Sequence, residues 1–367
     1  MKKILVITPF FYPHIGGSEQ YMLGLYAALK KQSPQVEVDV LCYNTDKVEK
    51  LEKYKGLNIY RLPCYKILQD QFYIPKPLSL LRFLFNHRSN YDLIHCSTRF
   101  FDSSWWGVLF AKVTNTKAVL TDHCASYPVH KNKAISLISK VIDLTISNFF
   151  LHLFDGVFVE NIKTQKFLKS AFGVNSKVCY PGIEKELFSL KKQKKGRVNV
   201  VYIGRLIESK GIKTLFDIAA ATPGADFVFA GTGPLLEDLK SSVMKNKLQN
   251  VFVLGKINRV EVMSLLKTAD IFAYPTWHSE GLPISLLEAG ACAVAIVATN
   301  KGGISEVIKN NSMGLLVNSK DKSAFKKALD RLISDSKLRL KLGKNLQEEV
   351  KEKFIWDNAI EEVKKYL

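Results

Sequence analysis

Residues 198 to 211 read VNVVYIGRLIESKG. The first seven form an apolar run, which is typical of a β-strand buried on both faces of a parallel sheet. Gly204 allows a tight exit from that strand, and a helix is expected to begin just after it. Arg205 supplies a planar fork of donors and Lys210 a compact charge, while a helix N-terminus adds free amides. This corner therefore suits a diphosphate, although an exposed turn has the same pattern.

Similar strand-like runs recur along the chain, each followed by a helical or loop stretch. They are rich in Val, Ile, Leu and Phe and lie at 3–8, 36–42, 92–96, 117–121, 156–160, 198–204, 226–231, 251–255, 270–275 and 295–299. This alternation predicts an α/β fold with doubly wound parallel sheets. A lysine-rich break at 189–198 divides the chain into two Rossmann-like halves. Ligands bind at the carboxyl ends of such strands, so two sheets facing each other predict an interdomain cleft.

The bulk composition limits the class of protein. The chain has 367 residues, about the length of two ordinary domains. With 47% hydrophobic and 24% charged residues it is globular rather than disordered or fibrous. The six cysteines stand singly with no CxxC pair. We therefore expect no metal site and no disulfide framework, and a reducing cytoplasm as the compartment.

The net charge of +19 is strongly basic, and the isoelectric point is about 9.5. Such a balance indicates nucleic acid, an anionic membrane or an anionic substrate as a partner, or merely lysine-rich solvated helices. No run of about 18 consecutive apolar residues occurs, so no helix is predicted to span a bilayer. Residues 130–154 combine helically spaced apolar residues with lysines. We interpret them as an amphipathic helix that faces the core, with a membrane-interface helix as the alternative.

A second polar constellation surrounds WHSEGLPISLLEAG (277–290), which follows a predicted strand. Glu280 lies in the loop, and Glu288 falls in the second turn of an apolar helix, where a carboxylate is costly unless it is paired or faces a cleft. Glu288 there can hold two vicinal ribose hydroxyls, and Glu280 can accept sugar hydroxyls. The amides of Gly281 and Leu282 lie at the helix N-terminus, where they can face an anion.

Three further features follow strand ends. GTGP (231–234) permits close backbone approach to a ligand, or simply closes a strand-to-helix turn. PHIGGSEQYMLGLYAAL (13–29) places Gly16 and Gly17 between the first strand and a long helix, the position of a phosphate-cradling turn. It is not GxGxxG, which argues against a standard nicotinamide or flavin site. His123 stands just past its strand, where an imidazole can touch a bound sugar, or it is a structural histidine.

Taken together, these motifs resemble the retaining nucleotide-sugar glycosyltransferases of the GT-B architecture, group 1 (family 4). The residues that carry the resemblance are PHIGGSE near the start, GRxxxxKG, GxGP and the E-x7-E from Glu280 to Glu288. It covers nearly the whole chain and includes a closing helix at 354–367. The resemblance implies an N-terminal acceptor domain, 1–188 with the returning helix, and a C-terminal nucleotide-sugar donor domain, 189–353.

The resemblance also implies roles in the second half of the chain. Arg205 and Lys210 bind the donor diphosphate and stabilise the charge that develops as it leaves. Glu288 holds the ribose hydroxyls. Glu280, with the amides of Gly281 and the residue after it, contacts the donor sugar near the reacting carbon.

In the first half, Gly16 and Gly17 let the backbone meet the phosphates or the acceptor. His123 corresponds to the family's histidine near the donor sugar, although its Asp-His-Cys setting differs from the commoner His-Asp order. Two other segments also depart from the family pattern. ENIKTQ (160–165) lacks the serine that commonly follows the strand, and YPGIE (180–184) replaces the usual Asn-Gly-Ile-Asp.

The resemblance implies a cytoplasmic, retaining hexosyltransferase that moves a sugar from a nucleoside diphosphate sugar to an acceptor hydroxyl, in cell-surface glycan or glycolipid synthesis. Arg205 and Lys210 would stabilise the negative charge that develops on the departing diphosphate, so we expect no cofactor and no metal. A basic surface suits a lipid-linked or polyanionic acceptor and peripheral contact with the anionic inner face of the membrane. A GT-B sugar-nucleotide epimerase is the alternative. A nucleic-acid-binding protein is less favoured because aromatic–basic clusters are not evident.

Overall fold

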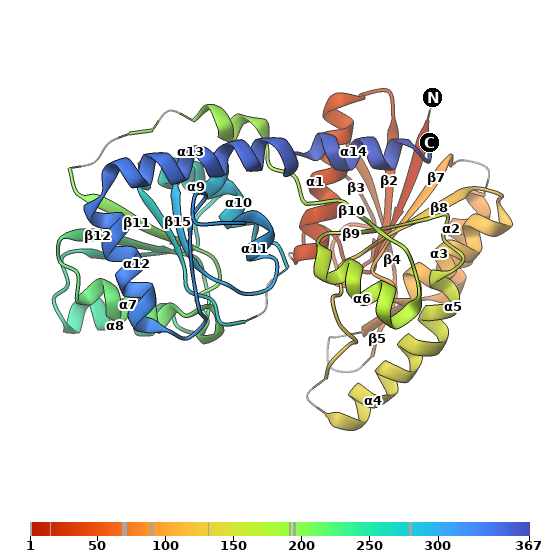
Figure 1. Cartoon of the computed structure of the whole chain (residues 1–367). Helices are drawn as coiled ribbons and strands as arrows, with labels where there is room; N and C mark the ends of the chain where they lie inside the picture. The colour runs from red at the N-terminus through yellow and green to blue at the C-terminus, as the bar shows by residue number, and fades with distance from the viewer. Residues whose placement is uncertain are drawn as a thin grey trace. The chain divides into compact units, whose positions relative to one another are not determined.

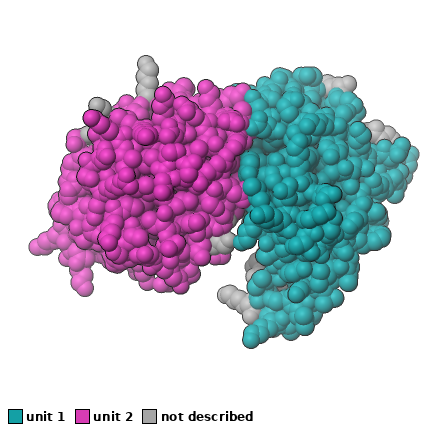
Figure 2. Space-filling model, in the orientation of Figure 1, with its two compact units in different colours: residues 1–182, 356–367 teal, residues 183–355 magenta. Residues whose placement is uncertain are grey.

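The structure is a computed structural model that describes residues 2–14, 16–67, 72–88, 91–130, 132–190, 192–193, 196–278 and 281–367 (Figure 1). The chain forms two compact units, Met1–Gly182 with Trp356–Leu367 and Ile183–Ile355, which Figure 2 colours separately. Each unit contains a predominantly parallel sheet with helices packed on it. The predicted α/β class is confirmed.

The sheet of the first unit has eight strands within the described residues, in the order β10-β9-β8-β7-β1-β2-β4-β3. Their bounds are β1 Lys3–Ile7, β2 Glu37–Tyr43, β3 Leu51–Tyr54, β4 Leu57–Leu62, β7 Leu93–Ser97, β8 Lys117–Asp122, β9 Gly156–Val159 and β10 Lys177–Val178. All neighbours pair in parallel except β3, which is antiparallel to β4. A separate antiparallel hairpin joins β5 Cys64–Ile67 to β6 Phe72–Pro75.

The strand interiors are apolar on both faces because both faces are covered. Along β1, Ile4 and Val6 join one hydrophobic cluster, whereas Leu5 and Ile7 join another on the opposite face. Side chains alternate across a strand, so a continuous apolar run fills two cores at once. Of the strands of this unit that the sequence did not predict, β3, β5, β6 and β10 have only two to four residues, and β3 and β5 have more exposed side chains. The remaining one, β4, has six residues.

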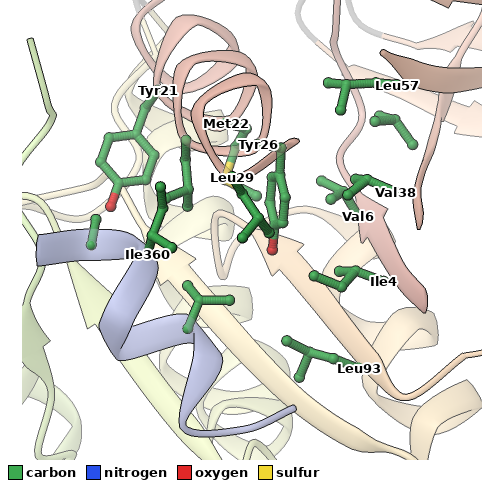
Figure 3. Packing of buried hydrophobic residues seen from close by; sticks show 14 of the residues in the cluster. Ile4, Val6, Tyr21, Met22, Tyr26, Leu29, Val38, Leu57, Leu93 and Ile360 are labelled. Atoms are coloured by element: carbon green, nitrogen blue, oxygen red, sulfur yellow. The ribbon is translucent and has the colours of Figure 1, made fainter. Parts of the chain in front are cut away.

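The helices of the first unit divide between the two faces. They are α1 Gly17–Gln32, α2 Pro77–Asn86, α3 Asp102–Val113, α4 Lys133–Ile142, α5 Asn148–Leu151, α6 Ile162–Phe172 and α14 Trp356–Lys364. On one face, α1 contributes Tyr21, Met22, Tyr26 and Leu29 to a core that Ile360 of α14 joins (Figure 3). The returning helix expected at 354–367 therefore packs on α1 and completes this core.

The sheet of the second unit has six parallel strands over the residues that the structure covers, in the order β13-β12-β11-β14-β15-β16. Their bounds are β11 Val198–Ile203, β12 Ala225–Ala230, β13 Val251–Gly255, β14 Ile271–Tyr274, β15 Ala295–Thr299 and β16 Leu315–Val317. The helices are α7 Ile212–Ala220, α8 Leu236–Lys245, α9 Arg259–Thr268, α10 Ile284–Ala291, α11 Ile304–Val307, α12 Lys322–Ser334 and α13 Ser336–Lys353.

The strand order of the second unit reverses between β11 and β14. From β11 the chain proceeds outward to β12 and β13, then returns to β14 on the other side of β11. The connections that follow β11 and β14 therefore lead to strands on opposite sides of the sheet. This is the topological switch point at which open α/β sheets bind ligands.

The compact units divide after Gly182 rather than after residue 188, where the sequence placed the boundary. Ile183 forms an isolated parallel bridge with Ile355, and its amide donates to the carbonyl of Phe354 at 2.8 Å. The buried Leu187 follows, and its carbonyl accepts from the Cys292 thiol. These contacts join 183–188 to the second unit before the lysine-rich break begins.

The helix formed by α4, a π-helical turn at Asp143–Ser147 and α5 contradicts its predicted core-facing orientation. Its buried residues are mainly polar, Ser139, Asp143 and Ser147, followed by Leu151. Its apolar side chains face outward, with 64% of Leu137 and 60% of Ile138 exposed. In Figure 1, α4 projects from the rest of its unit. The core-facing interpretation was wrong because Arg99, far away in sequence, gives the polar side a buried partner.

The same helix also concerns the prediction that no helix of the chain spans a bilayer. Within the described part of the chain, Lys133–Leu151 is long and apolar enough to cross a membrane, judged by length and composition alone. The search for an unbroken apolar run missed it because serine, lysine and aspartate interrupt the segment.

Candidate active site

The loop after β11 brings the first predicted pair to the switch point. Arg205 lies two residues after the end of β11 and is exposed, and its guanidinium has no side-chain partner among the described residues. Lys210 ends a short 3-10 turn, and its Nζ donates to the hydroxyl of Tyr274 at 3.0 Å. Tyr274 is the last residue of β14, so the neighbouring strand positions this ammonium group. Sequence reasoning missed Tyr274 because tyrosine at a strand end has no distinguishing pattern.

The GTGP turn supports this loop rather than approaching a ligand at its glycines. Gly231 and Gly233 both have positive φ angles. A Cβ at Gly231 would clash with the carbonyl oxygen of Gly204, and one at Gly233 with that of Leu206. The Leu206 amide also donates to the carbonyl of Thr232 at 2.8 Å. Of the two interpretations offered for these glycines, the structure favours the structural turn, which holds the Arg205 loop in place.

The loop after β14 is fastened to the same corner through one carbonyl. Ser209 accepts backbone hydrogen bonds from Trp277 at 3.0 Å and His278 at 3.2 Å, and the Thr276 hydroxyl donates to it at 3.2 Å. Ser209 directly precedes Lys210, so the loops after β11 and β14 are joined next to the residue that carries the ammonium group. Glu280, predicted to contact the sugar, lies outside the described residues.

Beyond Glu280, the chain enters α10 as predicted. The carbonyl of Gly281 accepts a hydrogen bond from the Gly303 amide at 3.1 Å. A Cβ at Gly303 would clash with that carbonyl, so the close approach requires glycine. Leu282 is buried, and Pro283 is the N-cap residue of α10. Gly281 and Leu282 therefore lie just before a helix N-terminus, the location expected for amides that face an anion.

Glu288 lies in the second turn of α10, as predicted, and is almost wholly buried. Its Oε1 pairs with the guanidinium of Arg259, which also reaches Glu184 at 3.1 Å. Burial raises the pKa of the Glu288 carboxyl, and the charge of Arg259 partly offsets that effect. Arg259, at the start of α9, is the partner that the sequence argument required for a buried carboxylate. It was not identified, because nothing near it in sequence points to Glu288.

His123 occupies a buried acidic environment in the first unit. Its Nδ1 lies 2.8 Å from Oε1 of Glu160, although the angle departs from that of a hydrogen bond, and Tyr21 meets the ring edge-on at 5.4 Å. Burial lowers the pKa of His123, but Glu160, Asp122 and Glu19 outweigh it, so the pKa is raised. Its buried Nε2 has no hydrogen-bond partner in the described structure. The ring is thus a candidate donor to a ligand.

Glu160 directly follows β9 and begins the segment 160–165, which departs from the family pattern. The structure places its carboxylate beside His123. Thirty-seven residues separate the two, and adjacent parallel strands β8 and β9 bring them together. Only the strand pairing reveals this contact.

Gly16 and Gly17 lie at the start of α1, as expected. Gly16 is the N-cap residue and Gly17 the first helical residue. A Cβ on Gly16 would clash with the carboxylate of the buried Glu19, whereas one on Gly17 would meet open space. The charge of Glu19 also contributes to the raised pKa of His123. Gly16, Gly17, Glu19 and His123 therefore belong to one region of the first unit.

Arg99 organises the segment that carries His123, and sequence reasoning missed it. All five of its donors are used. Nε and Nη2 bind the carboxylate of Asp143 at 3.1 and 2.9 Å, and Nη1 binds Asp122. The remaining hydrogen bonds reach the carbonyls of Cys124 at 3.1 Å and Ser126 at 3.0 Å. One buried guanidinium therefore links the π-helical turn to the residues on both sides of His123.

From the sequence alone, Trp105 and Trp106 could form a sugar-stacking surface or pack in the core, and the structure shows both engaged in packing. Trp105 stacks on Phe150 with ring centroids 6.0 Å apart, and its indole N–H donates to the carbonyl of Arg99 at 2.9 Å. The Trp106 indole N–H donates to the hydroxyl of Tyr43 at 3.2 Å. Of the two readings left open, the packing role is the one that these contacts support.

The predicted residues thus form two groups, each within its own unit. Arg205, Lys210 and the amides before α10 lie in the second unit, and the glycine pair and His123 lie in the first. The interdomain cleft that would join the groups remains a prediction. Within the described ranges, no group of three or more His, Cys, Asp or Glu side chains could hold a metal ion.

Comparison with protein families assigns both units. Residues 15–187 match the family described as Glycosyltransferase Family 4, and residues 183–349 match the family described as Glycosyl transferases group 1. The two matches together cover nearly the whole chain and meet close to the boundary between the units. The chain belongs to the group 1 (family 4) glycosyltransferases.

Curated relatives agree over most of their length. An uncharacterized glycosyltransferase of Methanocaldococcus jannaschii is 26% identical, with 100% of this chain and 98% of the relative covered. The N,N'-diacetylbacillosaminyl-diphospho-undecaprenol alpha-1,3-N-acetylgalactosaminyltransferase of Campylobacter jejuni is 28% identical, with coverages of 91% and 92%. A phosphatidylinositol N-acetylglucosaminyltransferase subunit of Saccharomyces cerevisiae is 26% identical, with coverages of 84% and 70%.

Solved structures confirm the GT-B fold. Sucrose-phosphate synthase from Thermosynechococcus elongatus superposes with a TM-score of 0.77 at 21% identity, covering 100% of this chain and 98% of that one. HepE of Anabaena in complex with UDP gives a TM-score of 0.75 at 16% identity, covering 100% and 99%. At these identities the likeness establishes the architecture.

Proposed function

We propose that this glycosyltransferase moves a sugar from a nucleoside diphosphate sugar to an acceptor hydroxyl with retention at the anomeric carbon. The observation that carries the proposal is the cationic corner at the β11–β14 switch point. There, among the residues that the structure describes, Arg205 has no side-chain partner, and Lys210 donates to the hydroxyl of Tyr274. Two cations at the carboxyl ends of parallel strands, beside a helix N-terminus, suit a diphosphate. HepE, which shares the fold, has been crystallised with UDP and with UDP-glucose.

The chemistry proposed for this corner is electrostatic. As the bond between sugar and diphosphate breaks, negative charge grows on the departing phosphate oxygens. Arg205 and Lys210 are already in place to stabilise that charge, so little reorganisation accompanies the reaction. In the first unit, the raised pKa of His123 favours the imidazolium, whose Nε2–H can donate to a hydroxyl of the donor sugar. We expect no added metal or cofactor.

We propose a lipid-linked acceptor and a cytoplasmic enzyme held at the inner face of the membrane, acting in cell-surface glycan or glycolipid synthesis. The names of two relatives include a lipid, diphospho-undecaprenol in one and phosphatidylinositol in the other. The net charge of +19 agrees with an anionic surface as the working environment.

The donor proposal is tested by thermal-shift titration with a panel of nucleoside diphosphates and their sugars. We expect one nucleotide to stabilise the wild type selectively. Arg205→Ala should weaken that nucleotide by about tenfold to a hundredfold, the typical cost of losing a hydrogen bond to a charged group. Arg197→Ala is the matched control, since Arg197 precedes the opposite end of β11 and pairs with Asp226 at 3.4 Å. Equal loss in both variants, or no nucleotide response at all, would refute the diphosphate site.

The reaction is tested by product analysis with the donor that the titration identifies. Transfer to a lipid-linked acceptor with an unchanged anomeric configuration in the product supports retention. An inverted product contradicts it. A donor sugar that is converted without any acceptor would instead identify an epimerase. Activity that survives a chelator agrees with metal-independent chemistry, whereas activity restored only by a divalent cation opposes it.

A further inference from the structure

The helix made of α4, the π-helical turn and α5 has inverted polarity for a soluble protein. Its buried residues include Ser139, Asp143 and Ser147. Six large apolar side chains instead lie exposed, and we call them the α4–α5 apolar surface: Leu137, Ile138, Val141, Leu144, Ile146 and Phe149. A helix on a globular core normally buries its apolar stripe and exposes its polar one. Contiguous exposed apolar side chains of this kind mark a contact with something else.

This orientation is fixed by strong interactions on the polar side. Asp143 pairs with the buried Arg99, and Phe150 stacks on Trp105 of α3. Leu151 is buried in the core beneath α3. Turning the helix over to hide its apolar stripe would take the Asp143 carboxylate away from the buried Arg99 guanidinium and remove two of its five hydrogen bonds, which is strongly unfavourable. The buried contacts on the opposite side of the helix therefore hold the α4–α5 apolar surface outward.

The charges near this surface are positive. From 132 to 152, Asp143 is the sole acidic residue, and it is buried against Arg99. Lys133 and Lys140 are exposed on the same helix. An exposed apolar face flanked by lysines and free of exposed carboxylates is the composition of helices that lie in the interface of an anionic membrane.

Helix α2 has the same character. Its Leu78, Leu81 and Phe85 are exposed, as are the cations Arg82 within the helix and Arg88 just after it. Phe83 of α2 packs in the same core as Leu151 of α5, so both helices cover the same face of the sheet. Basic and apolar side chains are thus combined on two helices of one side of the first unit.

We propose that the α4–α5 apolar surface docks onto an anionic lipid bilayer, with the helix lying in the plane of the interface. At 1.5 Å per residue, the 19 residues of Lys133–Leu151 measure about 28 Å, which is long enough to span a bilayer. The Asp143–Arg99 pair, however, holds one side of the helix against its own unit. Two copies of this surface would bring lysines together, so charge favours a lipid partner over self-association.

Flotation with lipid vesicles tests the docking. The probes are vesicles of phosphatidylcholine with about one-third phosphatidylglycerol, and vesicles of phosphatidylcholine alone. We expect the wild type to float with the anionic vesicles, and the triple variant Leu137→Ser, Ile138→Ser and Val141→Ser to lose at least about tenfold in partitioning, because each removes buried apolar area.

The matched control replaces three exposed apolar residues of the second unit, Met244→Ser, Leu254→Ser and Leu340→Ser. Met244 and Leu340 are 72% and 74% exposed, so this variant removes at least as much surface hydrophobicity as the first. We expect it to float as the wild type does. Equal loss in the two triple variants, or wild type that stays with the soluble fraction, would overturn the proposal.

Two further readouts separate the rival occupants. Lys133→Ala with Lys140→Ala should weaken binding to the anionic vesicles by about tenfold and leave binding to phosphatidylcholine alone unchanged. Resistance to an alkaline carbonate wash would show a helix that crosses the bilayer and would refute an interfacial one. A dimer in sedimentation velocity that the serine triple variant abolishes, without vesicle binding, would assign the surface to a second copy and also refute the proposal.

The inference names the membrane partner of the proposed function, but it does not depend on sugar transfer. Vesicle flotation requires neither donor nor acceptor, and nucleotide titration requires no lipid. A protein that binds nucleotide but not vesicles refutes the docking alone. One that binds vesicles but no nucleotide refutes the donor site alone.

Discussion

Two helices on opposite sides of the first unit's sheet, α1 and the α4–α5 helix, orient their apolar side chains in opposite ways. On one side, α1 turns Met22, Leu25 and Leu29 inward, and Ile360 of α14 covers them. On the other side, the α4–α5 helix turns its serines and Asp143 inward and leaves its apolar stripe outside. Both helices are amphipathic in sequence. Hydrophobic periodicity thus shows that a helix has an apolar face, but not what that face meets.

The largest effect is expected where charge is buried beneath the inverted helix. Arg99→Met should lower the free energy of unfolding by about 3–5 kcal/mol, because two carboxylates, Asp122 and Asp143, would remain buried without their partner. Urea denaturation measures this change. Arg197→Met, at an exposed arginine, should change stability by less than about 0.5 kcal/mol. Similar values for the two would show that the polar side of α4–α5 contributes little.

The apolar side of the comparison is tested at α14. Ile360→Ala should destabilise the protein by about 2–5 kcal/mol, since the buried side chain leaves a cavity between α14 and α1. The same substitution at Ile138 should cost less than about 0.5 kcal/mol, because that side chain is exposed. If the two isoleucines cost the same, the contrast between the two sides of the sheet is lost.

A pH effect of a few kcal/mol is expected from His95, in the core that α1 covers. Its Nδ1 lies 2.5 Å from the Tyr26 hydroxyl and its Nε2 2.7 Å from that of Thr121. Burial, with the nearby charge of His123, lowers the pKa of His95 to about 3. Because the folded state resists protonation, its stabilising contribution is complete above about pH 6.5 and is lost as pH falls toward 3. Urea unfolding at several pH values measures the loss, which should disappear in His95→Gln.

The pKa of His123 is shifted in the opposite direction from that of His95. Its pKa is raised, so the stability gained from the imidazolium is complete below about pH 6.5 and is lost as pH rises through the folded pKa. Histidine NMR titration should give a midpoint above that of a free histidine. Glu160→Gln should lower the midpoint and reduce turnover by about tenfold or more. Glu237→Gln, an exposed carboxylate on α8, should do neither. An unmoved midpoint in Glu160→Gln would dismiss the pairing.

The smallest stability effect belongs to the apolar surface itself. Leu137→Ser should change the free energy of unfolding by no more than about 0.5 kcal/mol in either direction, because the side chain is already in contact with solvent. Denaturation in the absence of lipid measures it. A loss of several kcal/mol would mean that the surface is part of a core, and would contradict its outward orientation.

The sequence alone determined the features that arise from local chemistry. Apolar runs such as 198–204 predicted parallel strands, since only strands buried on both faces lack polar alternation. Arg205 and Glu288 lie just after a strand and in the second turn of a helix, as expected, because each position follows from its immediate neighbours. Lys210, expected at a helix start, ends a 3-10 turn just before α7. The group 1 (family 4) assignment followed from the same short motifs and was confirmed across the chain.

Only the tertiary structure decided which distant residues meet. Arg99 meets Asp143, Glu160 meets His123, and Arg259 meets Glu288 through strand pairing and helix packing that no local pattern encodes. The first of these pairs also decided which way the α4–α5 helix faces. A buried guanidinium needs carboxylates more than the core needs another apolar stripe, because an unpaired buried charge costs more than exposed hydrocarbon.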